Sequence, residues 1–441
     1  MTRSTTRVSP AWICAAMYLG LSCAGAVRAE LAAGTEISAA NWEQVRQETF
    51  EGKTIESMVP VSIQKAIKEY NFKIWLKNSE PLLMANHILD ATEKYQGTAQ
   101  YDPQTRQVTG YVAGIPFPDL DAVAQMAPEI AGDLMFYNVF FARSLDGDYS
   151  NCYGPYATVH LNTEKGVERV QGAQAIVLRT MGRTSGGPHQ IGDDPNLRKL
   201  QIITFDSPYD IAGLGVYRKV YADGRLDDIY AYVKAVRRVR RLSGGSWMDT
   251  LAGASLLNDD TFVTEAHPMW YPRIELKEKR WILWPVHSDT VVAHDLAEVL
   301  DYQNPPYWNF INKNWEPTEV YVLEVTTPEE HPYGKKTLYM NARIPTFHLS
   351  ETYTKGGEMW RVIYSGIGPH PYDPADGGPG VYDQYNFGVW DFRSEHGNYM
   401  DCGRMDANPP DLRYEDFTQR MLVEAADGKR HGLETEFGEG P

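Results

Sequence analysis

Cysteine is scarce in this sequence, with 4 residues in a chain of 441. No two of them form a Cys-x-x-Cys pair or join a histidine cluster, so the sequence predicts neither a redox dithiol nor a zinc site. Cys14 and Cys23 lie near the N-terminus, which leaves Cys152 and Cys402 for the body of the chain. In an oxidising compartment such a pair readily forms a disulfide. We therefore expect a Cys152–Cys402 bond, with two free thiols as the alternative.

Basic residues are fewer than acidic ones, with 42 Lys and Arg against 58 Asp and Glu and a formal charge of -16. Nucleic-acid binding needs a basic footprint on the protein, so this balance argues against a nucleic-acid partner. Charged residues make up 23% of the chain and apolar residues 43%. Such proportions are typical of a globular protein and exclude a disordered or collagen-like chain.

Long apolar runs are missing beyond the N-terminus. At the N-terminus, Arg3 and Arg7 precede an apolar stretch at residues 11–21, and small residues follow. This order is typical of a secretory signal peptide, so we expect residues 1–29 to be a leader that is cleaved after its last residue. A membrane anchor and lipidation of Cys23 are the alternatives. The alanine-rich flanks are typical of bacterial leaders and predict a periplasmic protein.

Motifs of several catalytic classes are also absent. The sequence contains no P-loop, no Gly-x-Ser-x-Gly and no His-Glu-x-x-His. Adjacent aspartates occur at residues 193–194, 227–228 and 259–260. Neighbouring residues on a strand point to opposite faces, so we interpret these pairs as turn and cap residues instead of catalytic carboxylates. We expect no enzymatic activity, no cofactor and no metal; a catalytic triad assembled from distant residues stays open.

Aromatic residues, in contrast, are abundant, at 12% of the chain. They favour strands, because they fit the pleated surface of a sheet. Helical patterns occur at residues 38–70 and 119–142, and residues 85–100 are ambiguous. From these patterns we expect one large β-rich domain over residues 30–424, with its helical part at about 30–142. The polar tail at 425–441 is expected to fray.

Short apolar runs follow one another from about residue 155 onward, with little helical pattern between them. Residues 214–221 and 228–239 are predicted to form a hairpin, because the intervening Asp223-Gly224 pair suits a tight turn. Two further strands are expected on either side of a charged turn at residues 277–280. This succession favours an antiparallel sheet over a parallel one with crossover helices.

The segment from Asp206 to Pro285 carries the most distinctive pattern. It contains Tyr230-Ala231-Tyr232 and, a few residues later, Arg237-Arg238-Val239-Arg240-Arg241-Leu242. With residues 114–118 upstream and 356–362 downstream, it resembles the exported bacterial family catalogued as domain of unknown function 1329. That family looks related to the carriers that sort lipoproteins to the outer membrane.

The resemblance implies a fold and a kind of ligand. The sorting carriers fold as a strongly curved antiparallel barrel that is not closed, and helices cover its open face. Acyl chains occupy the cavity between the sheet and the helices. The resemblance therefore implies a mainly β fold with some α, as a large incomplete (half-open) antiparallel β-barrel covered by helices. It implies no catalytic role.

Two sets of residues are candidates for ligand contact. Arg238 and Arg240 are expected to share a strand face with Tyr230 and Tyr232, because side chains alternate along a strand. Guanidinium groups bind carboxylate and phosphate, so this set predicts contact with a lipid headgroup or an acidic partner; a solvated strand face is the alternative. The second set consists of tryptophans expected to line an apolar cavity, with ordinary core packing as the alternative: Trp247, Trp270, Trp281, Trp284 and Trp360.

These features lead to one main hypothesis for function. We expect a periplasmic binding or carrier protein for a lipophilic molecule such as a lipid, a fatty acid or a sterol-like compound. Its protein partner would be a membrane transporter or an outer-membrane protein. A non-enzymatic scaffold of an outer-membrane or efflux complex is the first alternative. An exported hydrolase of lipids or glycans is the second.

Overall fold

The computed structural model describes residues 29–142, 148–251, 253–287, 296–298, 300–310, 314–369, 382–401, 404–407 and 413–428. The expected leader up to residue 28, including the lipidation candidate Cys23, lies outside the described residues. So do Cys402 and the tail from residue 429. The signal peptide and the Cys152–Cys402 pairing therefore stay predictions.

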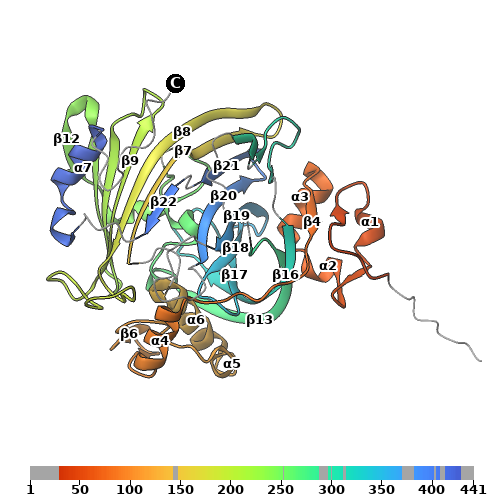
Figure 1. Cartoon of the computed structure of the whole chain (residues 1–441), viewed down its shortest axis with the longest axis horizontal. Coiled ribbons are helices and arrows are strands. Elements are labelled where there is room, and N and C mark those ends of the chain that lie inside the picture. Colours follow the sequence, from red (N-terminus) through yellow and green to blue (C-terminus); the bar gives the residue numbers. More distant parts are fainter. Residues whose placement is uncertain are drawn as a thin grey trace, which may run out of the picture.

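One sheet of 16 strands organises the chain (Figure 1). Its main path runs β1-β4-β16-β17-β18-β19-β20-β21-β7-β8-β9-β10-β11-β12; β13 pairs with β16, and β22 pairs with β7. The strands are β1 Glu36–Ile37, β4 Ile74–Leu76, β7 Tyr149–Asn162, β8 Gly166–Arg179, β9 Leu197–Ser207, β10 Leu214–Tyr221, β11 Asp228–Val233, β12 Arg238–Arg241, β13 Arg273–Trp284, β16 Asn314–Thr326, β17 Lys335–Asn341, β18 Phe347–Tyr353, β19 Met359–Pro369, β20 Tyr382–Asp391, β21 His396–Asp401 and β22 Arg404–Ala407.

The sheet does not close on itself. Among the described residues, β12 pairs only with β11 and β13 pairs only with β16, so each forms a free edge. Neighbouring strands are antiparallel, apart from the short parallel contact between β4 and β16. The expectation of a half-open antiparallel barrel covered by helices is confirmed.

Seven helices lie around this sheet in the described part of the chain: α1 Trp42–Val45, α2 Ile55–Met58, α3 Val61–Tyr70, α4 Asn86–Tyr95, α5 Leu120–Val123, α6 Pro128–Ala142 and α7 Gln419–Ala426. Short 3-10 helices are η2 Lys234–Val236, η3 Gly244–Met248, η4 Asn258–Val263, η5 Pro268–Trp270, η6 Leu296–Glu298 and η7 Tyr414–Asp416. The two-stranded pairs are β2 Thr49–Phe50 with β3 Lys53–Thr54, β5 Gln100–Asp102 with β6 Gln107–Thr109, and β14 Leu300–Asp301 with β15 Asn309–Phe310. The helical expectations at residues 38–70 and 119–142 are confirmed, with β2 and β3 interrupting the first.

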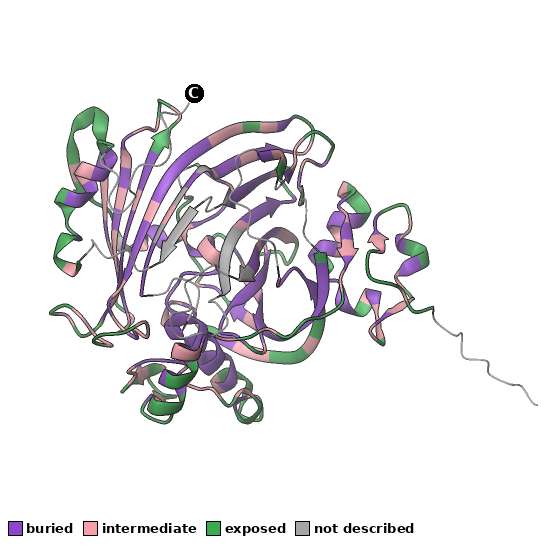
Figure 2. Cartoon of the chain, viewed as in Figure 1, coloured by how far each residue is buried: buried purple, intermediate pink, exposed green. Residues whose placement is uncertain are grey.

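The two faces of the sheet bury different partners. Face 1 carries Tyr321 and Leu323 of β16 and packs against α6 and residues 244–271. Face 2 carries the alternate residues Val320 and Val322, and packs against α3 on one side of the molecule and α7 on the other. In Figure 1, α7 lies at the left and α1 to α3 lie at the right of the sheet. Figure 2 shows that the strands are buried along most of their length, whereas α4 and α5 each have an exposed side.

Helix α6 is almost completely buried because nearly all of its surface is apolar. Twelve of its 15 residues are buried, as expected for a helix that is hydrophobic on all sides. Gly132 allows it to approach β13 closely, since a Cβ at this position would lie 2.5 Å from the carbonyl oxygen of Ile274. The helix thus holds one end of face 1 in place.

The predicted charged turn at residues 277–280 is wrong. β13 runs continuously from Arg273 to Trp284, with one bulge between Leu276 and Glu278. Its lysines form cross-strand ion pairs with β16, such as Lys279 Nζ to Glu319 Oε2 at 3.3 Å. A run of charges on an exposed strand therefore resembled a turn in the sequence.

His267, which lies between η4 and η5, should make the protein less stable in acid. Its buried ring accepts from the Met269 amide at Nδ1 and donates from Nε2 to the Ala222 carbonyl, each at 3.1 Å. Burial lowers its pKa to about 3, so the unfolded chain binds the extra proton. The contribution of His267 to the free energy of unfolding is complete above pH 6.5 and is lost as the pH falls toward 3, by about 1.4 kcal/mol per pH unit.

In urea unfolding at pH 7, 5.5 and 4, the free energy of unfolding of H267Q should depend less steeply on pH than that of the wild type. Equal slopes would contradict the prediction, and H396Q, at a half-exposed histidine, is the control.

Candidate functional site

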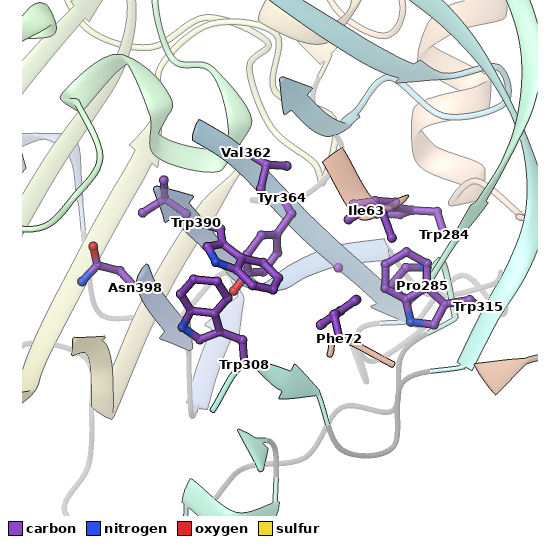
Figure 3. A pocket seen from close by; sticks show the side chains of 12 residues that line it. Ile63, Phe72, Trp284, Pro285, Trp308, Trp315, Val362, Tyr364, Trp390 and Asn398 are labelled. Carbon is purple, nitrogen blue, oxygen red and sulfur yellow. The ribbon is translucent and has the colours of Figure 1, made fainter. Parts of the chain in front are cut away.

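Three cavities in the described part of the chain are candidates, and the first is a tryptophan cage (Figure 3). Its volume is about 20 Å³, and its walls include Trp284–Trp315 and Phe72–Trp390 ring contacts at 5.2 and 5.5 Å. This space holds about one water molecule. The cage lies in the core between α3 and the sheet. Its aromatic residues therefore act as packed core and leave no room for a ligand.

The second cavity is a polar groove of about 360 Å³ between α5 and strands β13, β16 and β17. Three of the charged side chains in it form ion pairs. Lys279 Nζ lies 3.3 Å from a carboxylate oxygen of Asp121 and 3.3 Å from one of Glu319. Tyr321 donates a further hydrogen bond to Asp121. Asp119 and Arg343 also line the groove, so its lining is charged, unlike that of the third cavity.

The third cavity, the apolar pocket, lies on face 1 between the sheet and residues 244–271. Its volume is about 100 Å³. It is lined by Cys152, Ala157, Thr158, Ala173, Ala175, Gln201, Ile203, Phe205, Leu251, Thr261, Phe262, Phe387 and Met400. The hollow arises at β8, because Ala173 and Ala175 place only methyl groups on face 1. Larger residues on β9, β20 and β21 surround these two positions.

The cover of the apolar pocket is the irregular segment 244–271, which contributes Leu251, Thr261 and Phe262. The Phe262 ring packs at 4.9 Å on that of Phe387 across the pocket. Phe262 and Val263 have φ values of 49° and 77°. A positive φ is costly for bulky and β-branched residues, so the surrounding contacts must hold this backbone in place.

A buried ionic cluster supplies the first of these contacts. Lys336 Nζ lies 2.8 Å from a carboxylate oxygen of Asp259 and 3.0 Å from one of Asp260. Tyr271 and Tyr333 donate to the same two carboxylates at 2.6 Å. Burial by itself would raise the pKa of Asp259, but Lys336 and the neighbouring His331 together lower it. The two carboxylates in turn raise the pKa of Lys336 against the effect of its burial. The adjacent acids were interpreted as turn and cap residues; they are also a buried ionic anchor.

A second ionic cluster holds the next turn of the cover. Lys199 of β9 donates to both carboxylate oxygens of Glu265, at 2.7 and 3.0 Å. Arg218 of β10 lies 2.6 Å from Asp227 and 3.7 Å from Glu265. These side chains are almost fully buried. Residues 259–265 are thus fixed to face 1 at two places beside the apolar pocket.

The structure distributes the predicted tryptophans over four different environments. Trp284 lines the tryptophan cage. Trp247 and Trp270 contact each other at 5.4 Å within the cover. Trp281 is 38% exposed and lies beneath Lys53, and Trp360 donates from Nε1 to Asp391 at 3.0 Å. None of the five lines the apolar pocket.

The predicted face for the arginines is wrong. Tyr230 and Tyr232 lie on face 2, and Tyr232 is buried under α7. Arg238 pairs with Val233, and Arg240 pairs with Ala231, so both arginines stand on face 1. The reason is that η2 interrupts the expected strand: the chain turns at residues 234–237 and returns as β12, which breaks the simple alternation.

Sequence reasoning missed the small residues that create the apolar pocket. The only signal was the alternation of alanine with larger residues in β8, which also occurs in ordinary strands. Cys152 lines the pocket and is disulfide-bonded. This agrees with the expectation of a disulfide, while the partner assigned to it stays a prediction.

Two further findings concern metals and membranes. Within the part of the chain that the structure describes, no three His, Cys, Asp or Glu side chains are grouped so that they could hold a metal ion. No helix among the described residues combines the length and apolar character needed to cross a membrane.

Comparisons with known proteins give low-identity structural neighbours. A putative outer membrane lipoprotein-sorting protein domain from Vibrio parahaemolyticus is 13% identical, with a TM-score of 0.41 over 64% of this chain and 94% of that one. A DUF1329 family protein from Desulfovibrio piger is 16% identical, with a TM-score of 0.46 over 67% and 100%. A LolA superfamily protein from Nitrosomonas europaea is 13% identical, with a TM-score of 0.38 over 65% and 97%. No curated protein matches the chain. The family model described as "Protein of unknown function (DUF1329)" matches residues 36–421, so the chain belongs to that family.

Proposed function

We propose that this protein binds a lipophilic molecule in the apolar pocket and carries it through the periplasm. The observation that carries the proposal is the lining of the pocket, in which ten of the 13 residues are apolar and none is a lysine, arginine, histidine, aspartate or glutamate. Removing hydrocarbon from water contributes about 25 cal/mol per Å² of buried surface. Because the lining offers no charged or histidine side chain that could act as a general acid or base, the proposal is binding and not catalysis.

The size of the pocket limits what it can take. Pockets that enclose a whole small ligand usually measure about 300–1,000 Å³, whereas the apolar pocket measures about 100 Å³. It therefore suits one end of a hydrocarbon chain, with the remainder of the ligand outside it. A membrane transporter or an outer-membrane protein is the proposed partner that delivers or receives the ligand.

The test is to identify what the protein carries. The full chain would be produced in a bacterial periplasm with its own leader, purified without detergent, and examined by native mass spectrometry and solvent extraction. We expect a lipophilic molecule at close to one per protein. A protein that is empty and takes up no fatty acid, phospholipid or sterol would overturn the proposal and favour a scaffold.

A further inference from the structure

Two rows of cross-strand neighbours lead along face 1 from the apolar pocket to the free edge of the sheet at β12. The first row is paired in register at every step and consists of Ala175, Ile203, Val216, Ala231 and Arg240. The second row lies beside it and consists of Ala173, Phe205, Leu214, Val233 and Arg238. Both rows begin in the lining of the pocket and end on an arginine of β12.

The middle of these rows is an apolar surface that the cover leaves open. Ala173 and Phe205, at the pocket, are each 7% exposed. Leu214, Val216 and Ala231 are partly exposed, and Val233 is 41% exposed. We call Leu214, Val216, Ala231 and Val233 the apolar strip. Neighbouring strands lie about 4.8 Å apart, so the distance across four steps from Ala175 to Arg240 is about 19 Å.

The strip ends at two positive charges that face the same side. Residues two apart on a strand are separated by about 7 Å, so Arg238 and Arg240 can approach one ligand group together. Both are exposed, and neither takes part in an ion pair within the described structure. Arg241, by contrast, is paired with Asp228 on face 2. The stretch 233–243 contains five Lys or Arg and no acid, although the chain as a whole carries a formal charge of -16.

We infer that the ligand is an amphiphile with a long hydrocarbon chain and a carboxylate or phosphate head. The end of its chain fills the apolar pocket, the rest lies on the apolar strip, and the head binds Arg238 and Arg240. Guanidinium groups form paired hydrogen bonds with both kinds of head. This inference rests on the proposed function and names the substrate class for the same site. It also gives the ligand a route, because the strip reaches the pocket from the free edge without any movement of the cover.

Protection of the sheet edge is the competing explanation for these arginines. Charged residues on an edge strand prevent pairing with another chain. That role would be served equally by arginines on either face. It does not account for an apolar strip that connects the pocket with Arg238 and Arg240 in particular.

The experiment compares three probes with the same 16-carbon chain: hexadecanoate, hexadecyl phosphate and hexadecanol. Delipidated full chain would be titrated with each probe, as wild type, as R238Q/R240Q and as R237Q/R241Q. The last variant removes the same charge from the same hairpin, one of its arginines being on face 2. Thermal unfolding would show that all three proteins are folded.

We expect the wild type to bind one or both anionic probes at least about tenfold more tightly than hexadecanol, the range given by one charged hydrogen-bonded contact. R238Q/R240Q should lose this preference and keep its affinity for hexadecanol, while R237Q/R241Q should retain both. The anion that is preferred identifies the head as carboxylate or phosphate. The inference is overturned if the wild type binds hexadecanol as tightly as the anions, or if R238Q/R240Q binds the anions unchanged; the proposed function survives either result. If none of the three probes binds, the inference fails; the proposed function fails with it only if the extraction experiment also finds the protein empty and no phospholipid or sterol is taken up.

Discussion

Replacing Lys336 with methionine is expected to lower the free energy of unfolding by about 3–5 kcal/mol, the usual cost of removing one partner from a buried ion pair. Lys336 is fully buried, and so are the carboxylates of Asp259 and Asp260 that it contacts. Without the ammonium group, two adjacent carboxylates would remain in the core. Their remaining donors include the hydroxyls of Tyr271 and Tyr333, which carry no compensating charge, and the ring of His331.

Lys335 provides a matched control for this prediction. It is the preceding residue on β17, and its ammonium group lies 2.8 Å from Glu324 in a pair that is partly open to solvent. Exposed pairs contribute about 0–1 kcal/mol, so K335M should change stability little. Urea unfolding of both variants at pH 7, followed by far-UV circular dichroism, measures the difference. A similar small effect of both substitutions would show that the buried cluster does not anchor the cover.

The pKa of Asp259 gives the same cluster a dependence on pH. The ammonium group of Lys336 holds this pKa below its value in the unfolded chain. The unfolded chain therefore takes up a proton first as the pH falls. The contribution of Asp259 to stability is complete above about pH 4 and decreases below it. In this range the effect adds to that of His267, which begins at a higher pH.

The fold was predictable because it depends on patterns that are local in sequence. Strand-length apolar runs and turn residues specify an antiparallel sheet, and the hairpin around Asp223-Gly224 is present as β10 and β11. The errors have local causes as well. The charges at 277–280 belong to a strand whose side chains reach across to β16. The turn at 234–237 reverses the chain. Assigning alternate residues to alternate faces, as in an uninterrupted strand, therefore places Arg238 on the wrong face.

The candidate site was harder to predict because it depends on contacts that are distant in sequence. Asp259 and Lys336 are 77 residues apart, and nothing near either residue indicates the other. The apolar pocket exists because Ala173 and Ala175 have small side chains. An alanine within a strand gives no sign of a cavity in the sequence, whereas large aromatic side chains are easy to select as candidates. The tryptophans were therefore reasonable candidates, but large rings that pack well, such as Trp284, fill space instead of leaving it open.

Replacing Ala175 with phenylalanine is expected to weaken the binding of hexadecanoate, hexadecyl phosphate and hexadecanol alike. The new ring would occupy the hollow on face 1, in which Ala175 contributes only a methyl group. A ligand that can no longer bury about two or three methylenes, at about 0.8 kcal/mol each, loses one to two orders of magnitude in affinity. Titration of the delipidated variant with the three probes measures this loss.

A122F serves as the control, because Ala122 is exposed on α5 and the same ring there should leave binding unchanged. Thermal unfolding should show that A175F remains folded, since its new side chain enters an existing cavity. Unchanged affinity in folded A175F would contradict a ligand site in the apolar pocket. The comparison with R238Q/R240Q is decisive, because that variant should affect only the anionic probes, whereas A175F should affect all three. Together the two variants separate the part of the site that binds hydrocarbon from the part that binds charge, and a scaffold protein would show neither effect.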